Sequence, residues 1–330
     1  MSKSFKKYKK SVSEDIILKQ FQNQEYQQLR VILDKLRQGD TLVARQLLLT
    51  YLKSLRKYNS DKNILRHKLF NIFTELADQA IKSEQLEFAS HVLNYAELFK
   101  EDIVTMNFRA ELLKLRNQLE ESEQVYRDTI AKFPDNVVAR TGYANLLLKL
   151  QRFEEARQLL SAQIARLQTR DDWINFHVYA MSFVREGKWD DAVSLLKQGV
   201  RDATVNQSYL RNSLAFAQLQ QRHWEDALDT LREVEPSPQE QPLVQLLEVE
   251  IYAEQALATE DQQQRAEYQH NAEQRLEQVR ARPGLTVWLQ RAMNQLIESY
   301  QLLTGKMITA ITPAQREAAN DAMFDALLAA

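Results

Sequence analysis

The sequence predicts an all-α protein built from repeated antiparallel helix pairs. Three observations indicate this fold class: turn residues are scarce, one pattern of small and bulky apolar residues recurs, and its period is the length of a helix pair. The 330 residues include only six glycines and six prolines. Sheets need turn residues about every eight to twelve positions, so this composition favours helices. A chain of this length also exceeds one ordinary core, which indicates several domains or a repeat array.

Small residues mark the predicted contact points within each helix pair. On the first helices they are Ala77, Ala110, Ala144, Ala180 and Ala215. Twelve positions later, on the second helices, they are Ala89, Ser122, Ala156, Ala192 and Ala227. The second set advances by 33, 34, 36 and 35 positions. Antiparallel helices reach the short end of the usual ~8–10 Å separation only where small side chains meet.

Bulky apolar residues flank each of these second-helix positions. Three positions before it stand Leu86, Leu119, Phe153, Trp189 and Trp224. Four positions after it stand Leu93, Tyr126, Leu160, Leu196 and Leu231. Residues four apart share one helix face. A single pair cannot bury this face alone, so neighbouring pairs are expected to stack on it.

The pattern resembles the tetratricopeptide repeat family, whose period is 34 residues. The matching spans are 70–102, 103–136, 137–170, 173–206 and 208–241. The resemblance implies a right-handed α-solenoid whose first helices line a concave groove that binds another protein. The chain departs from the family pattern in lacking the first-helix tryptophan. The mid-repeat glycine remains only as Gly187, and Arg109 occupies a position that is usually apolar.

The predicted organisation has five parts. They are a basic tail with the start of the first helix (1–24), a divergent helix pair (25–69), the five repeats (70–241), a wider divergent pair (242–284) and C-terminal capping helices (285–330). Prolines at 236, 238 and 242 break the helix after the fifth repeat. The last helix is expected to begin at a capping box over residues 312–315.

The sequence contains no pattern for catalysis, and it predicts no enzyme, cofactor, metal or small-molecule substrate. Cysteine is absent, which excludes disulfides, thiolate nucleophiles and cysteine-bound zinc. No two glycines lie within ten residues of each other, so a glycine-rich phosphate loop is excluded. The one ExxH motif, Glu267–His270, lacks the further ligands that a di-iron site needs.

The family resemblance places ten residues on the groove side of the first helices. They are Asn107, Glu111, Lys114, Thr141, Asn145, His177, Met181, Tyr209, Asn212 and Phe216. Amides can satisfy main-chain groups of a bound segment while the apolar side chains anchor it. The predicted function is a scaffold, adaptor or assembly factor that binds a partner peptide or helix; the alternative is an ordinary exposed surface. Either way, we expect these side chains to be solvent-exposed and dispensable for folding.

The carboxylate clamp of some family members is matched only at Asn145. Thr141 replaces its lysine partner, and Tyr209 and Ser213 stand where basic residues are expected. This match is too incomplete to predict binding of a chaperone C-terminus.

The N-terminus offers an alternative function. Its lysines could hold membrane phospholipid or nucleic acid while the repeats hold a protein, or they could form a solubilising tail. These residues are Lys3, Lys6, Lys7, Lys9 and Lys10. Between Glu225 and Arg280 the charge reverses, with 14 acidic against 4 basic residues. No apolar run approaches the ~20 residues of a membrane span and no signal-peptide core follows the lysines, so a cytoplasmic location is expected.

Overall fold

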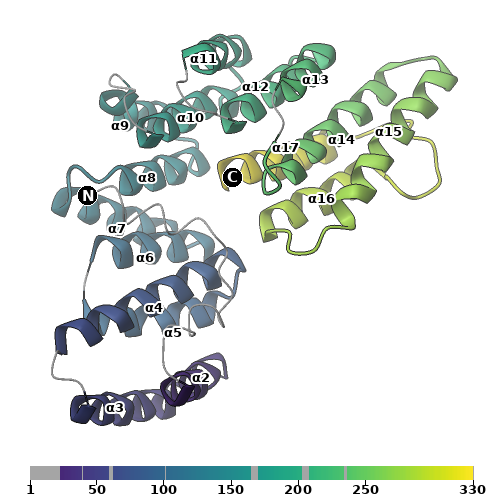
Figure 1. Ribbon diagram of the computed structural model, residues 1–330. Coiled ribbons are helices and arrows are strands. Elements are labelled where there is room, and N and C mark those ends of the chain that lie inside the picture. Colours follow the sequence, from purple (N-terminus) through teal and green to yellow (C-terminus); the bar gives the residue numbers. More distant parts are fainter. Residues whose placement is uncertain are drawn as a thin grey trace. The chain divides into compact units, whose positions relative to one another are not determined.

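The computed structural model describes residues 23–38, 40–58, 62–100, 102–164, 170–202, 208–233 and 236–329. Every regular element in these ranges is an α-helix, and successive helices form antiparallel pairs (Figure 1). The predicted all-α fold class is therefore confirmed. The chain divides into two compact units, Met1–Leu146 and Leu147–Ala330, which are called unit 1 and unit 2 below.

Unit 1 contains three helix pairs and most of an unpaired helix. Its helices are α2 (Asn23–Arg37), α3 (Thr41–Tyr58), α4 (Lys62–Lys82), α5 (Leu86–Phe99), α6 (Ile103–Leu115), α7 (Leu119–Lys132) and α8 (Val137–Lys149), of which the last three residues belong to unit 2. Aromatic rings fill part of the core, where Phe73 stacks on Tyr95 and Phe99 with ring centroids 5.8 and 5.9 Å apart. The residues before the first predicted repeat extend α4 back to Lys62.

Unit 2 continues the pairs and ends in two further helices. Its helices are α9 (Phe153–Ile164), α10 (Arg170–Arg185), α11 (Trp189–Asp202), α12 (Ser208–Gln220), α13 (Trp224–Arg232), α14 (Gln241–Ala258), α15 (Gln262–Arg280), α16 (Val287–Tyr300) and α17 (Pro313–Ala329). The pair α14–α15 is longer than the others, as its wider spacing in the sequence predicted. Helix α17 packs on α16 and also lies against α12 and α14.

The predicted contact points within the pairs are confirmed. All ten small residues have an exposed fraction of 1% or less. Ser122 is the single polar member of the set, and its hydroxyl donates a 2.8 Å hydrogen bond to the carbonyl of Ala110 on the partner helix. The polar side chain therefore fits because it has a main-chain acceptor within the pair.

One left-handed residue closes the turn inside each of the five repeats. These residues are Glu84, Asn117, Gln151, Gly187 and Arg222, with φ angles from 53° to 78°. Each turn also has the two hydrogen bonds of a Schellman motif. In the last of them the amides of Arg222 and His223 donate to the carbonyls of Leu219 and Gln218, both at 2.9 Å. Four of the five repeats thus adopt the left-handed conformation with a residue other than glycine, although the family pattern has glycine at this position.

The unusual Arg109 is explained by its neighbours on α5. Its guanidinium binds Glu97 through two hydrogen bonds, Nε–Oε1 at 2.9 Å and Nη2–Oε2 at 2.5 Å. It also donates to Oδ1 of Asn94 at 2.9 Å. This charged position links the second helix of one repeat to the first helix of the next.

Candidate partner-binding surface

The unit 1 part of the predicted groove lies on α6 and α8. Asn107 is buried, with 8% of its surface exposed, and its Nδ2 lies 3.5 Å from Oδ1 of Asn136. That oxygen also accepts a 2.7 Å hydrogen bond from the amide of Ala139 in the first turn of α8. The prediction that Asn107 is exposed is therefore wrong, because it packs where one repeat joins the next.

Glu111 and Lys114 are half-buried and form an ion pair of 2.8 Å. The buried Tyr126 donates its hydroxyl to Glu111 at 3.2 Å. Burial and the nearby Glu111 carboxylate raise the pKa of Tyr126 well above its ordinary value. The carboxylate is thus held in place from the second helix of the same repeat, with its lysine partner one turn further along α6.

Thr141 and Asn145 lie one turn apart on α8 and are half-buried. The Thr141 hydroxyl donates to the carbonyl of Val137 at 2.9 Å. Oδ1 of Asn145 is buried and accepts no hydrogen bond from the residues that the structure describes. Unit 1 therefore presents an ion pair and two half-buried polar side chains on its first helices.

Unit 2 buries most of its predicted groove residues. The exposed fractions are 0% for Met181, 2% for Phe216, 3% for Asn212 and 5% for His177. Tyr209 is half-buried, and its ring meets the His177 ring edge-on with centroids 5.5 Å apart. The prediction that these side chains are solvent-exposed is therefore wrong for Met181, Phe216, Asn212 and His177, and Tyr209 is exposed only in part.

The reason lies in the last helix of the chain. Helix α17 lies against α12 and α14 and reaches Arg185 of α10, on the side where these residues sit; this side of the three helices is called the inner face below (Figure 1). One side of α17 is buried between its paired helix α16 and the inner face, and its members are Ala319, Ala322, Met323, Phe324, Ala326 and Leu327. The sequence predicted this helix and its start, but not its position on the first helices.

Polar contacts attach the first half of α17 to α14 and α12. Arg316 binds Glu254 of α14 through both carboxylate oxygens, at 2.7 and 3.0 Å. Asn320 exchanges two amide hydrogen bonds with Gln220 of α12, both at 3.0 Å. Paired, directional contacts of this kind fix the register of the helix on the inner face.

Polar contacts attach the second half of α17 to α10. Asp321 forms an ion pair with Arg185, whose guanidinium also lies 5.1 Å from the centre of the Phe324 ring. His177 forms a hydrogen bond with the main chain of Leu327. Helix α17, which pairs with α16, therefore also meets α14, α12 and α10 in turn.

Two buried titratable groups lie on the inner face. Burial lowers the pKa of His177 to about 4, despite the hydrogen bond to Leu327, so the ring is neutral at pH 7. Burial and the nearby Glu254 raise the pKa of Glu250 to about 8, so this carboxyl is mostly protonated at pH 7. The hydroxyl of Tyr300 donates to Glu254 at 2.8 Å. Among the charged groups described on this face, Arg185 and Glu254 pair with Asp321 and Arg316 of α17.

Residues 113–176 match the family model described as tetratricopeptide repeat. This stretch runs from the end of α6 to α10 and contains the turns at Asn117 and Gln151. The chain contains tetratricopeptide repeats. The fold agrees with a crystal structure of a tetratricopeptide repeat protein from Parabacteroides merdae, at 14% identity and a TM-score of 0.54, with 83% of this chain and 97% of that one covered.

PilF of Pseudomonas aeruginosa is a more distant structural match to these tetratricopeptide repeats. The identity is 17% and the TM-score 0.46, with 67% of this chain and 95% of that one covered. No curated protein matches the sequence. The family model and the Parabacteroides merdae structure therefore establish the repeat fold, and the partner is inferred from the surface.

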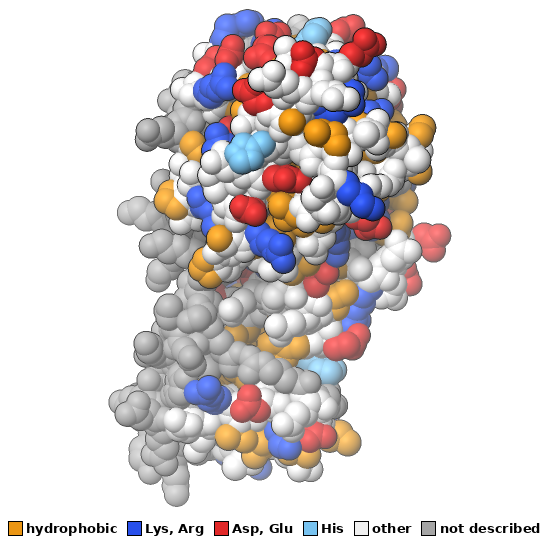
Figure 2. Space-filling view, turned by 90° about the vertical axis from the view of Figure 1, so that its right-hand side faces the viewer, with side chains coloured by type: hydrophobic (Ala, Val, Ile, Leu, Met, Phe, Trp, Pro, Cys, Tyr) orange, Lys and Arg blue, Asp and Glu red, His pale blue; other side chains and the backbone are white. Residues whose placement is uncertain are grey.

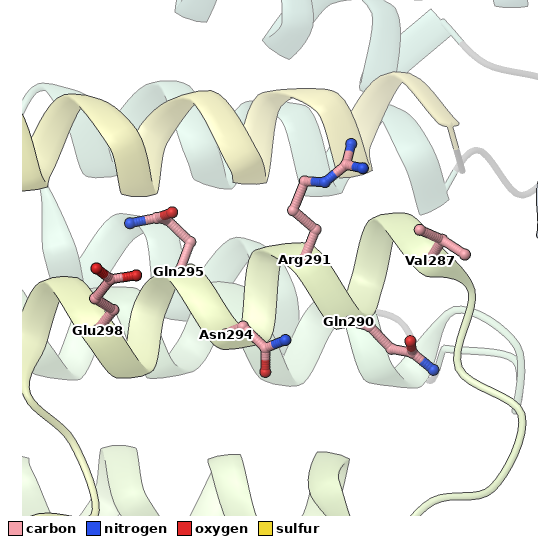
Figure 3. A pocket seen from close by; sticks show the side chains of 6 residues that line it. All are labelled: Val287, Gln290, Arg291, Asn294, Gln295 and Glu298. Carbon is pink, nitrogen blue, oxygen red and sulfur yellow. The ribbon is translucent and has the colours of Figure 1, made fainter. Parts of the chain in front are cut away.

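Beyond the tetratricopeptide repeats, an open hollow of about 280 Å³ lies along α16. Its lining consists of Val287, Gln290, Arg291, Asn294, Gln295 and Glu298. Figure 3 shows these side chains projecting from successive turns of the helix, and the guanidinium of Arg291 lies 5.1 Å from the centre of the Trp288 ring. Small-molecule sites are mostly apolar and enclosed, whereas this lining is polar and open, as on a solvated helix face.

The exposed surface of the repeat protein is mixed in charge. Figure 2 shows acidic and basic side chains interspersed on one face, with apolar side chains in small separate groups. The described residues contain no cluster of three or more His, Asp or Glu side chains that could hold a metal ion. In the same residues, no helix has both the length and the apolar character to cross a membrane. The five N-terminal lysines lie outside the described residues.

Proposed function

We propose that this protein is a non-enzymatic scaffold, adaptor or assembly factor that binds a segment of another protein along the first helices of its repeats. The observation that carries the proposal is α17, because the inner face of unit 2 holds an amphipathic helix by apolar burial and polar contacts together. Helix-in-groove recognition uses the same two kinds of contact. Tetratricopeptide repeats are, in addition, typical of protein–protein interaction.

Unit 1 has four polar side chains on its first helices that its own fold buries only in part. Glu111, Lys114, Thr141 and Asn145 stand on α6 and α8 at positions that correspond to the unit 2 positions beneath α17. All four are half-buried, so a bound segment would complete their desolvation, and contacts of that kind carry much of the energy of an interface. We therefore assign the unit 1 part of the binding surface to these four residues.

A triple variant of unit 1 tests the proposal. Lys114→Ala, Thr141→Ala and Asn145→Ala remove side chains at half-buried positions without opening the core, so the unfolding transition should shift little. A partner would first be identified by pull-down from the native host, then purified. We expect its dissociation constant for the triple variant to rise at least about tenfold, since each central polar contact commonly contributes 1 kcal/mol or more.

A matched control comes from the second helix α7. Gln124→Ala, Asp128→Ala and Lys132→Ala remove three exposed side chains from the same unit. Parental affinity in this control, with reduced affinity in the unit 1 variant, would assign binding to the first helices. Equal affinity of the two variants for the purified partner would refute that assignment.

A further inference from the structure

Helix α17 pairs with α16 and, in addition, makes contacts along the inner face like those of a bound helical ligand. Its buried stripe combines three alanines with Met323, Phe324 and Leu327, and ion pairs and one amide pair flank the stripe. The Arg316–Glu254 pair is partly buried, with side chains 36% and 11% exposed, whereas the Arg185–Asp321 pair is open to water, with side chains 33% and 46% exposed. Exposed pairs of this kind contribute little to stability, but they set orientation and partner choice.

The segment before α17 is held independently of the helix. Gln269 of α15 donates to the carbonyl of Lys306 at 2.7 Å and accepts from the amide of Ile308 at 2.8 Å. Glu273 accepts from the amide of Leu303 at 3.0 Å. These bonds fix residues 303–308 on α15, so release of α17 would leave the preceding loop in place.

The helix also has local features that preserve it away from the inner face. Thr312 caps it, with its hydroxyl accepting from the amide of Gln315 at 3.2 Å and the Gln315 side chain accepting from the amide of Thr312 at 2.9 Å. Its sequence, PAQREAANDAMFDALLA, is rich in alanine, the residue with the highest helix propensity. A segment with these features loses little free energy by staying helical while it is released from the inner face.

We propose that α17 is an internal ligand of the unit 2 inner face, and that a partner helix of the same chemistry replaces it there. This inference rests on the proposed function above. The partner helix carries an arginine for Glu254, an acidic residue five positions later for Arg185, and an aromatic residue three positions after that for the Arg185 guanidinium. Small residues occupy the buried stripe between them, as Ala319 and Ala322 do in α17.

Competition with a tethered helix makes the proposal measurable. A short tether holds α17 at an effective concentration of about the millimolar range. The apparent affinity for a free helix falls in proportion to the fraction of time that the inner face is vacant. Substitutions that weaken α17 without changing α10, α12 or α14 should therefore tighten the binding of an added helix.

The probe is a fluorescein-labelled peptide of residues 311–330, and the measurement is fluorescence anisotropy with the full chain. In Asp321→Ala with Phe324→Ala, α17 loses both of its contacts with Arg185 while the inner face is unchanged. We expect this chain to bind the peptide at least about tenfold more tightly than the parent. Glu317→Ala, at an exposed position of α17, is the matched control and should bind as the parent does.

A charge exchange shows where the peptide binds. Adding Arg185→Glu to the double variant should weaken peptide binding severalfold, and a peptide with Asp321→Arg should restore it. Both chains carry the same α17 substitutions, so a folding defect would affect them alike. If the double variant does not fold, Asp321→Ala alone, which removes one half-exposed ion pair, should still give a few-fold increase in affinity.

Two results would overturn the inference. Equal peptide affinity in the parent and the weakened chains would show that α17 is a fixed part of unit 2. Tighter binding without any effect of Arg185→Glu would place the peptide elsewhere. Neither result would touch the unit 1 assignment, which is tested with a separate partner and separate variants.

Discussion

The left-handed turns predict that glycine should stabilise two repeats. Gln151 and Arg222 are exposed and have φ angles of 59° and 62°, in the region that favours glycine. A non-glycine residue pays roughly 1–2 kcal/mol for this conformation, whereas glycine loses about 0.5–1 kcal/mol of backbone entropy on folding relative to alanine. Gln151→Gly and Arg222→Gly should therefore each raise the free energy of unfolding by about 0.5–1 kcal/mol.

The same structure supplies controls in both directions. Gly187 has a φ of 78° at the equivalent turn, and a Cβ added there would meet nothing within 4 Å. Gly187→Ala should therefore lower the free energy of unfolding by about 1 kcal/mol through backbone strain alone. Asn117→Gly should change it less than Gln151→Gly does, because asparagine tolerates the left-handed region.

The assay follows from where the tryptophans lie. All four, Trp173, Trp189, Trp224 and Trp288, belong to unit 2. Urea denaturation followed by tryptophan fluorescence therefore reports the unit that contains Gln151, Gly187 and Arg222. The two stabilising effects should add, since the sites lie in separate turns. A decrease in stability for either glycine variant, or an increase for Gly187→Ala, would refute the reasoning.

Four further predictions concern packing and pH. Ala192→Leu should destabilise unit 2 by about 1–3 kcal/mol through overpacking, and an unchanged urea midpoint would mean that the contact point is misplaced. Gly142→Ala should destabilise unit 1, as shown by circular dichroism, because the new Cβ would lie 2.7 Å from the buried Tyr126 ring; parental stability would show that the ring moves freely. The pKa of His177 is about 4 in the folded protein against 6.5 for an unperturbed histidine. Its contribution to the free energy of unfolding is therefore fully present above pH 6.5 and is lost as pH falls towards 4, by up to roughly 3 kcal/mol. The free energy of unfolding of His177→Gln, measured over the same pH range, should lack this loss. For Glu250 the sign is opposite, because its pKa is raised from 4.5 to about 8 in the folded protein. The parent should therefore lose stability as pH rises through this range, and Glu250→Gln should not.

Much of the fold could be predicted because helix pairing depends on local spacing. The interval between Ala110 and Ser122 is set by one helix, one turn and the start of another, all within a single repeat. The turn at Arg222 was harder to predict, since the sequence offers no glycine there. Its left-handed backbone is imposed by the Schellman hydrogen bonds and by the helices on either side.

The candidate site was less predictable because its state depends on contacts that are distant in sequence. The spacing placed Phe216 and Met181 on the inner face, but their burial depends on a helix about a hundred residues further along the chain. The Arg185–Asp321 pair could have been suspected from charge alone, yet so could many others. A usable signal was the three- and four-residue spacing of Ala319, Ala322, Met323 and Ala326, which could have indicated a helix face to bury but not its place.

The central claim is that the inner face of unit 2 is a helix-binding site. Because the chain has no cysteine, Gln220→Cys with Asn320→Cys would place the only two thiols where the two amides now meet. A short, reducible bismaleimide linker should join them within one chain and lock α17 in place. The labelled 311–330 peptide should then fail to bind the linked chain, and binding should return when the linker is reduced. Equal peptide affinity before and after reduction would contradict the claim.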